Sequence, residues 1–203
     1  TSEWLAHIDA DEFILPCSNL SISQVLRHVP RAIDAIRILP TERLFERSPL
    51  PGELLFDGFF KIKQTKHASQ MARLLYGELE DLFPGGFFGH QVGKSFKRTA
   101  RRDLYLDIHL VRGISGQNVN STVLPQSQIT LAHFFPTSLE NFRTKHERRL
   151  DNEYYRRAIN DPKKLRFRLY DKARREGGDD AIMELFQNLC VISPSKSQEG
   201  VKR

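Results

Sequence analysis

Two carboxylates stand two positions apart near the start of the chain, at Asp9 and Asp11. They follow the apolar run Leu5-Ala-His-Ile8, which predicts a buried strand that ends in polar groups. Residues i and i+2 of an extended chain lie on the same side, so both carboxylates should converge on one divalent cation. Mg²⁺ and Mn²⁺ favour oxygen ligands and keep positions for water and substrate phosphates. The alternative is a surface turn, which is the commoner setting of such a pair.

His133 is a candidate third ligand, because it ends the predicted strand over 128–134 just before a capped helix. A neutral imidazole suits Mn²⁺. The alternative is a core histidine whose ring N–H is bonded to a backbone carbonyl, and His109 is the rival ligand. The sequence therefore indicates Asp9, Asp11 and His133 as metal ligands and leaves His109 open.

A second group of polar residues stands in the glycine-rich segment Gly89-His-Gln-Val-Gly-Lys94. His90 and Lys94 could neutralise the phosphates of a bound cofactor or donor. The adjacent Gly89 and Gly93 would let the backbone approach those phosphates closely. A β-hairpin would use the same glycines, so a purely structural interpretation stays open.

Three blocks of the sequence occur in the order found in a known family. Trp4-Leu-Ala-His-Ile-Asp-Ala-Asp-Glu-Phe-Ile-Leu-Pro16 resembles the central motif of bacterial family-2-like glycosyltransferases, which share a Trp-x-x-x-x-Asp-x-Asp-Glu-Phe signature. Phe88 to Phe96 is similar to the family's Gly-His-x-x-Gly-Lys segment. Leu131 to Lys145 is similar to its late block, in which a histidine and aromatic residues lead into a helix. The resemblance covers residues 4 to 150 and leaves out the tail.

The resemblance implies a nucleotide-diphospho-sugar transferase (GT-A-like) fold, which is α/β with a mixed sheet, flanking helices and here a helical C-terminal tail. It implies a nucleotide-diphosphate sugar as donor, Mn²⁺ or Mg²⁺ on Asp9 and Asp11, and a glycan, lipid or other hydroxyl as acceptor. The metal would stabilise the charge that grows on the departing nucleoside diphosphate.

The resemblance, together with the charge and composition of the tail, predicts the organisation of the chain. Residues 1–150 would be the C-terminal part of the catalytic domain, 151–192 a basic helical extension and 193–203 a disordered tail. The strand before the acidic pair should be interior to a sheet, with neighbours on both sides. We therefore expect the chain to be the later part of a longer protein.

Transfer with inversion at the sugar needs a general base for the acceptor hydroxyl. Glu12, beside the acidic pair, and Glu42, after the predicted strand over 35–39, are the candidate carboxylates. A different enzyme class, the phosphohydrolases with an aspartate nucleophile, also places Asp-x-Asp after an apolar strand. Those enzymes carry a small hydroxyl or β-branched residue where this chain has Phe13, which argues against them.

The positive charge of the chain is concentrated towards its C-terminal end. The net charge is +6 over 203 residues, and residues 143 to 175 hold 13 Lys and Arg against 5 Asp and Glu. Such a segment could face a phosphate-rich ligand, an anionic membrane surface or nucleic acid, and it could equally be a solvated helix surface. The alternative to catalysis is a basic binding module for nucleic acid or a membrane surface. For the transferase itself we expect no nucleic-acid partner.

The apolar runs are too short to cross a bilayer, so membrane contact would be peripheral, through the basic helices. Two cysteines, Cys17 and Cys190, are too few for a disulfide framework and indicate a reducing compartment. We expect a cytoplasmic protein, with the inner face of the membrane as a second location.

The remaining patterns predict the elements that position these residues. Capping boxes, in which a Ser or Thr and a Glu or Gln three residues later cap the start of a helix, predict helices after Ser21 and after Thr137. Apolar residues at helical spacing predict a helix over 69–83, and 113–128 is polar and turn-rich. Strands are predicted over 5–8, 35–39, 89–99, 104–111 and 128–134. The tail to Leu189 should be helical, with breaks near Asp161-Pro162 and Gly177-Gly178.

Overall fold

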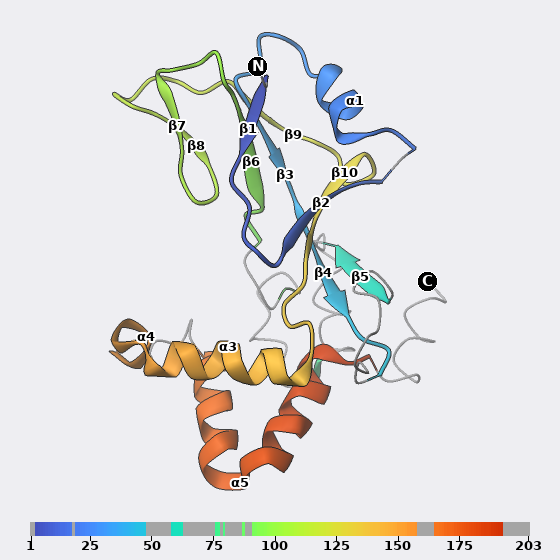
Figure 1. The fold of residues 1–203 in the computed structure, drawn as a ribbon, viewed down its shortest axis with the longest axis vertical. Helices are drawn as coiled ribbons and strands as arrows, with labels where there is room; N and C mark the ends of the chain where they lie inside the picture. Colours follow the sequence, from blue (N-terminus) through green and yellow to red (C-terminus); the bar gives the residue numbers. More distant parts are fainter. Residues whose placement is uncertain are drawn as a thin grey trace. The chain divides into compact units, whose positions relative to one another are not determined.

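The computed structural model describes residues 3–17, 19–47, 58–62, 76–77, 79, 87, 91–157 and 165–192. The chain forms two compact units. Unit 1 consists of Thr1–Glu42 and Gly89–His133, and unit 2 consists of Arg43–Phe88 and Phe134–Arg203. Strands dominate unit 1, and helices dominate the described part of unit 2 (Figure 1). The predicted mixed α/β class is confirmed, because helices accompany sheets that contain both parallel and antiparallel pairs.

The first sheet lies in unit 1 and has the strand order β1-β6-β3-β9. Its strands are β1 (Trp4–Ala6), β6 (Lys94–Arg98), β3 (Ala35–Ile38) and β9 (Ser121–Val123). β6 is antiparallel to both β1 and β3, whereas β9 is parallel to β3. The described residues give β1, the strand before the acidic pair, one neighbour, and the second neighbour expected for it stays a prediction. β1 stands at the edge of this sheet's strand order, and its neighbour there is antiparallel.

The second sheet has the strand order β2-β10-β4-β5. Its strands are β2 (Glu12–Pro16), β10 (Ile129–His133), β4 (Pro40–Leu44) and β5 (Phe59–Ile62). β10 agrees with the strand predicted over 128–134; it is antiparallel to β2 and parallel to β4. This register places His133 opposite Glu12 on one side and opposite Glu42 on the other. Three residues of the sequence analysis thus meet at one end of the sheet.

β3 leads directly into β4, so one extended segment takes part in both sheets. Leu39 lies between the two strands, and its carbonyl oxygen accepts hydrogen bonds from Leu131 N at 3.0 Å and from Thr130 Oγ1 at 3.1 Å. Pro40 keeps Leu39 extended, because a proline ring disfavours the helical conformation in the residue before it. The predicted strand over 35–39 is confirmed as β3, but the pairing continues to Leu44, which was not predicted.

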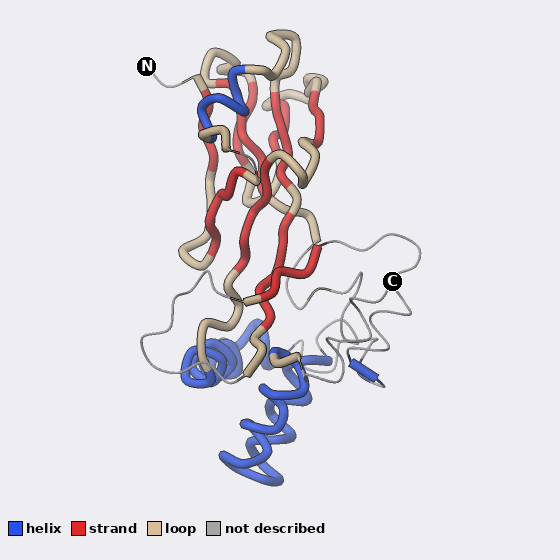
Figure 2. The backbone as a smooth tube through the Cα atoms, turned by 90° about the vertical axis from the view of Figure 1, so that its right-hand side faces the viewer, coloured by secondary structure: helices blue, strands red, loops and turns tan. Residues whose placement is uncertain are grey.

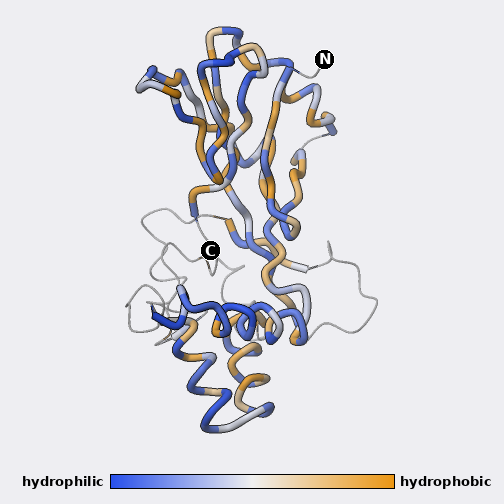
Figure 3. Tube along the Cα trace, turned by 60° about the vertical axis from the view of Figure 1, so that its left-hand side comes forward, coloured by the Kyte–Doolittle hydropathy of each residue, from blue (hydrophilic) through white to orange (hydrophobic). Residues whose placement is uncertain are grey.

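Side chains that alternate along the strands build the core of unit 1. Ile36 and Ile38 of β3 are completely buried, and Phe96 of β6 lies opposite Ile36. Ile129 and Leu131 of β10 belong to the same cluster. Figure 2 shows the strands of this unit side by side, and Figure 3 shows the hydrophobic positions distributed along them. Burial of each such side chain contributes about 1.5–3 kcal/mol, which holds the strand ends in place.

Helix α1 (Ile22–Arg27) begins where the capping box predicts. Ser21 Oγ accepts from Gln24 N at 3.2 Å, and Gln24 Oε1 accepts from Ser21 N at 2.8 Å. Two N–H groups that the helix start would leave open are thereby satisfied. The helix contributes Val25 and Leu26 to the core of unit 1.

The segment predicted as one strand over 104–111 is a hairpin instead. β7 (Leu104–Leu106) and β8 (Val111–Gly113) pair antiparallel. Asp107 N donates to Leu110 O at 2.8 Å, and the Asp107 carboxylate accepts from Ile108 N. A short acidic side chain that bonds its neighbouring backbone favours a turn over a continued strand. β9 is a second departure, because it lies in the segment predicted to be turn-rich.

Unit 2 has its own core, built by helices of the C-terminal region. These helices are α3 (Leu139–Asp151), α4 (Glu153–Arg157) and α5 (Leu165–Cys190). Phe142 of α3 is completely buried together with Tyr170 and Phe186 of α5. Because α3 and α5 share this core, the domain boundary expected near residue 150 falls inside a compact unit.

The start of α3 and the kink of α5 test two of the local predictions. The N-cap of α3 is Ser138 and not Thr137, since Ser138 Oγ accepts from Asn141 N at 3.0 Å. The break predicted at Gly177-Gly178 is confirmed as a kink, with Gly178 at φ 60°. No described helix is long and apolar enough to cross a membrane. The break at Asp161-Pro162, the tail 193–203 and most of the helix predicted over 69–83 lie outside the described residues.

Candidate functional site

The acidic motif forms a turn, and the prediction that it is extended is wrong. Glu12 N donates to Asp9 O at 3.1 Å, and Asp9 N donates to the Glu12 carboxylate at 2.8 Å. Two hydrogen bonds therefore close the four residues Asp9 to Glu12, and a side-chain carboxylate accepts one of them. In this turn Asp9 and Asp11 do not share a partner, because Asp9 lies against Lys94 and Asp11 lies against His133.

Lys94 is completely buried at the start of β6, and its ammonium group is enclosed by oxygen atoms. Its Nζ lies 3.0 Å from Asp9 Oδ2 and 3.5 Å from Glu12 Oε2, and it donates to Ile108 O at 3.1 Å. Burying an ammonium costs several kcal/mol, roughly the scale that paired carboxylates and hydrogen bonds must offset. The predicted phosphate ligand is thus already engaged with the acidic turn.

Gly93, the residue before Lys94, lets the chain pass close to β3. Its φ is +74°, and a Cβ atom added there would lie 2.0 Å from Ile38 O. Only glycine fits, because a side chain would meet a backbone atom in an unfavourable conformation. Gly93 does permit a close approach, as the sequence analysis expected of it. The approaching group in the structure is the neighbouring strand β3 and not a phosphate.

His133 ends β10 between two carboxylates. Its Nε2 lies 3.7 Å from Asp11 Oδ2, and its Nδ1 lies 3.7 Å from Glu42 Oε1. Burial by itself would lower the pKa of His133, but hydrogen bonding and the charges of Asp11 and Glu42 outweigh burial and raise the pKa to about 9. The imidazole is thus held in its charged form at neutral pH by the two acidic residues in the structure as described.

The two candidate general bases are both buried. Glu12 is 3% exposed and Glu42 is 1% exposed. Glu12 holds the acidic turn closed, and Glu42 faces His133 from the neighbouring parallel strand. In this conformation both carboxylates act on other residues of the cluster, so each is placed to position a side chain.

The remaining candidates lie beside this cluster or outside the described residues. His109 Nδ1 lies 3.2 Å from Gly93 O, and the carbonyl oxygen of His109 accepts from Ser95 Oγ at 2.9 Å. These contacts hold His109 against Gly93 and Ser95, the two residues that flank Lys94 in the chain. His90 lies outside the described residues.

The described residues contain no group of three or more His, Cys, Asp or Glu side chains arranged to hold a metal ion. The arrangement nearest to a ligand set is the pair Asp11 and His133, 3.7 Å apart. Adjacent octahedral ligands at about 2.1 Å from one ion are roughly 3 Å apart, so these two side chains would move slightly closer around an ion. Mg²⁺ is commonly held by one or two carboxylates, with water and substrate phosphates as the other ligands. Asp9, which is predicted as a ligand, contacts Lys94 instead.

Comparison with known proteins gives no relative. No family model matches the chain, and no similar curated protein or solved structure is found.

Proposed function

We propose that this chain is a metal-dependent glycosyltransferase, which moves a sugar from a nucleotide-diphosphate donor to a hydroxyl acceptor. The observation that carries the proposal is the meeting of the three motif blocks in one cluster. Asp9 and Asp11 come from the first block, Lys94 from the second and His133 from the third. Lys94 lies 3.0 Å from Asp9, and His133 lies 3.7 Å from Asp11. This convergence of the three blocks supports a shared site.

Asp11 and His133 would hold the Mn²⁺ or Mg²⁺ ion, which would displace the proton that the two carboxylates keep on the imidazole, because a histidine ligand is neutral. When bound, such an ion neutralises the diphosphate of the donor and the charge of the leaving group. Glu42 would orient the imidazole of His133 from the neighbouring strand, as carboxylates do behind metal-bound histidines. Lys94 and Glu12 would hold the turn that presents Asp11 to solvent, where its side chain is 27% exposed.

The fold family, the acceptor class and the general base belong to the same proposal. The presence of mixed sheets and helices is compatible with the GT-A-like fold that the motif blocks imply. The acceptor class, whether glycan, lipid or another hydroxyl, stays open. The general base stays a prediction at Glu12 or Glu42, and the burial of both carboxylates favours the positioning roles given above.

The proposal is tested by removing the exposed ligand. Release of nucleoside diphosphate from a panel of nucleotide sugars should require Mn²⁺ or Mg²⁺, and Asp11→Asn should abolish it. Asp11→Asn should also weaken Mn²⁺ binding, measured by electron paramagnetic resonance. The matched control is Asp107→Asn, which removes an exposed carboxylate from the β7–β8 turn and should leave both signals unchanged. Metal-dependent turnover that persists in Asp11→Asn would refute the proposal.

The competing interpretation, a basic binding module, finds less support in unit 2. Asp171 lies 3.3 Å from Arg174 and 2.8 Å from Arg175, and Arg143 lies 2.8 Å from Asp179. These side chains neutralise one another on exposed helix surfaces, which is the ordinary behaviour of a solvated helix. Peripheral membrane contact and a cytoplasmic location remain predictions.

A further inference from the structure

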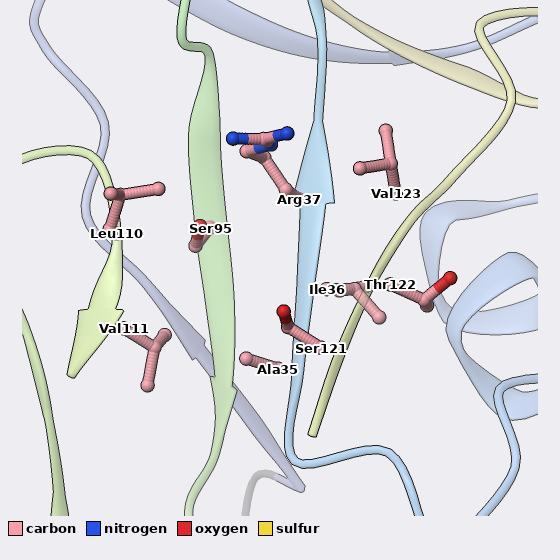
Figure 4. A pocket seen from close by; sticks show the side chains of 9 residues that line it. All are labelled: Ala35, Ile36, Arg37, Ser95, Leu110, Val111, Ser121, Thr122 and Val123. Atoms are coloured by element: carbon pink, nitrogen blue, oxygen red, sulfur yellow. The ribbon is translucent and has the colours of Figure 1, made fainter. Parts of the chain in front are cut away.

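A pocket of about 420 Å³ opens on the first sheet of unit 1, away from the acidic cluster. It is lined by residues of β3, β6 and β9 and by the segment that enters β8 (Figure 4). The lining residues are Ala35, Ile36, Arg37, Ser95, Leu110, Val111, Ser121, Thr122 and Val123. Its volume falls within the range of roughly 300–1,000 Å³ that is usual for small-molecule sites.

The strand register separates this pocket from the candidate metal site. Arg37 pairs with Ser95 of β6 and with Val123 of β9, so these side chains share one face of the sheet. Ile38, the next residue of β3, pairs with Lys94 on the opposite face. Successive side chains of β6 therefore serve two sites, with Lys94 facing the acidic turn and Ser95 facing the pocket.

Arg37 is the charged residue of the pocket lining. Its Nε is buried and makes no hydrogen bond to any residue that the structure describes. Figure 4 shows its guanidinium group above the pocket, between β6 and β3. A buried donor without an acceptor costs free energy, and a planar guanidinium fits the two oxygen atoms of a carboxylate or phosphate. No described residue supplies an acceptor to this Nε, and the guanidinium group lies at the pocket, where an anion would meet it.

The other lining residues define the rest of the ligand. Ser121 adds a hydroxyl group on the same face as Ala35, with which it pairs. Leu110, Val111 and Val123 add apolar side chains, and Val123 is 42% exposed. An anionic head with a compact apolar body would use both kinds of surface, because the apolar part gains free energy on leaving water.

We propose that this pocket binds a small organic anion, in which a carboxylate or a phosphate ester is joined to a compact apolar group. Arg37 binds the oxygen atoms of the anion in a forked contact, and Ser121 offers a further hydrogen bond. Leu110, Val111 and Val123 contact the apolar group. This site does not depend on the proposed transferase function, since it lies on the opposite face of β6 from Lys94.

The experiment uses benzoate and phenyl phosphate as probes and benzyl alcohol as the neutral analogue, with affinity measured by calorimetry on the full chain. At least one anion should bind with saturation while benzyl alcohol does not, and the tighter anion identifies the head group. Arg37→Gln should weaken that binding roughly 10- to 100-fold, the scale of a hydrogen bond to a charged group. Arg27→Gln, which removes an exposed arginine of α1, is the matched control and should have no effect.

A second variant keeps the test decisive if Arg37→Gln alters the sheet. Ser121→Phe fills the pocket from an exposed position on an outer strand of the sheet order and leaves Arg37 in place. It should abolish anion binding while the thermal unfolding transition stays within a few degrees of the parent. Absence of saturable binding of either anion to the parent chain overturns the proposal. Equal weakening by Arg37→Gln and Arg27→Gln also overturns it, because the effect would then be one of net charge.

Discussion

The ammonium group of Lys94 lies 3.0 Å from Oδ2 of Asp9, although 85 positions separate the two residues in the chain. Lys94 is buried, whereas the side chain of Asp9 is 46% exposed. The ion pair therefore connects the interior of unit 1 to the surface turn that carries the acidic motif. Glu12, which is buried and 3.5 Å from the same ammonium, completes this connection.

Replacing Lys94 by methionine should destabilise unit 1. The change leaves the carboxylate of Glu12 buried without its cation, and breaking a buried pair by removal of one partner costs about 3–5 kcal/mol. Urea unfolding followed by the fluorescence of Trp4, the single tryptophan of the chain, reports on the core of unit 1. Lys172→Met is the control, since Lys172 forms an exposed pair with Glu176 worth about 0–1 kcal/mol. Equal stability of the two variants would contradict the role given to Lys94.

Two glycines with similar backbone conformations should respond differently to alanine. Gly93 has φ +74° with Ile38 O at 2.0 Å from an added Cβ, whereas Gly116 has φ +77° with no atom within 4 Å. Gly116→Ala should lower the free energy of unfolding by about 1–2 kcal/mol, which is the cost of a left-handed conformation for alanine. Gly93→Ala adds a backbone clash and should cost roughly 2–6 kcal/mol. The same Trp4 fluorescence experiment measures the difference, and a loss no larger at Gly93 would show that β3 yields to the added atom.

Glu42→Gln should weaken Mn²⁺ binding without removing a ligand, if the proposed function is right. Glu42 lies 3.7 Å from His133 Nδ1 and would orient the ring from the neighbouring strand. Loss of such an orienting carboxylate typically lowers metal affinity about 10–100-fold. Paramagnetic resonance of Mn²⁺ gives the affinity, and Glu46→Gln at an exposed position is the control. Unchanged Mn²⁺ affinity in Glu42→Gln would show that Glu42 does not support metal binding.

The stability of unit 2 should fall at alkaline pH because of Tyr170. Its side chain is buried on α5, and its hydroxyl donates to Glu147 Oε1 at 3.3 Å. Burial, together with the charge of Glu147 and this hydrogen bond, raises the pKa of Tyr170 from 10.0 to about 12. The folded state keeps a proton that the unfolded state loses between these values, so the free energy of unfolding falls as pH rises through this window.

Absorbance of the phenolate form measures this directly. The wild-type chain should show an ionisation step near pH 12, and Tyr170→Phe should lack it. Tyr154→Phe, at a residue that is 67% exposed, is the control and should retain the step. A step that survives in Tyr170→Phe would assign the raised pKa to another tyrosine.

Local patterns predicted what depends on neighbours in the chain. The capping box at Ser21 predicted α1, because its hydrogen bonds join residues three positions apart. The glycine pair at Gly177-Gly178 predicted the kink of α5 for the same reason. The acidic pair was placed wrongly, because the i and i+2 rule holds only for extended backbone and the motif is a turn closed by Glu12.

Residue types and their spacing were enough to single out the residues that could carry chemistry, namely the acidic pair, Lys94 and His133. Their partners follow from the folded chain, because strand register depends on pairing across long stretches of chain. That register places His133 between Glu12 and Glu42, and it brings Lys94 to Asp9. It also places Ser95 and Arg37 on a separate face, where no motif in the sequence indicates a site.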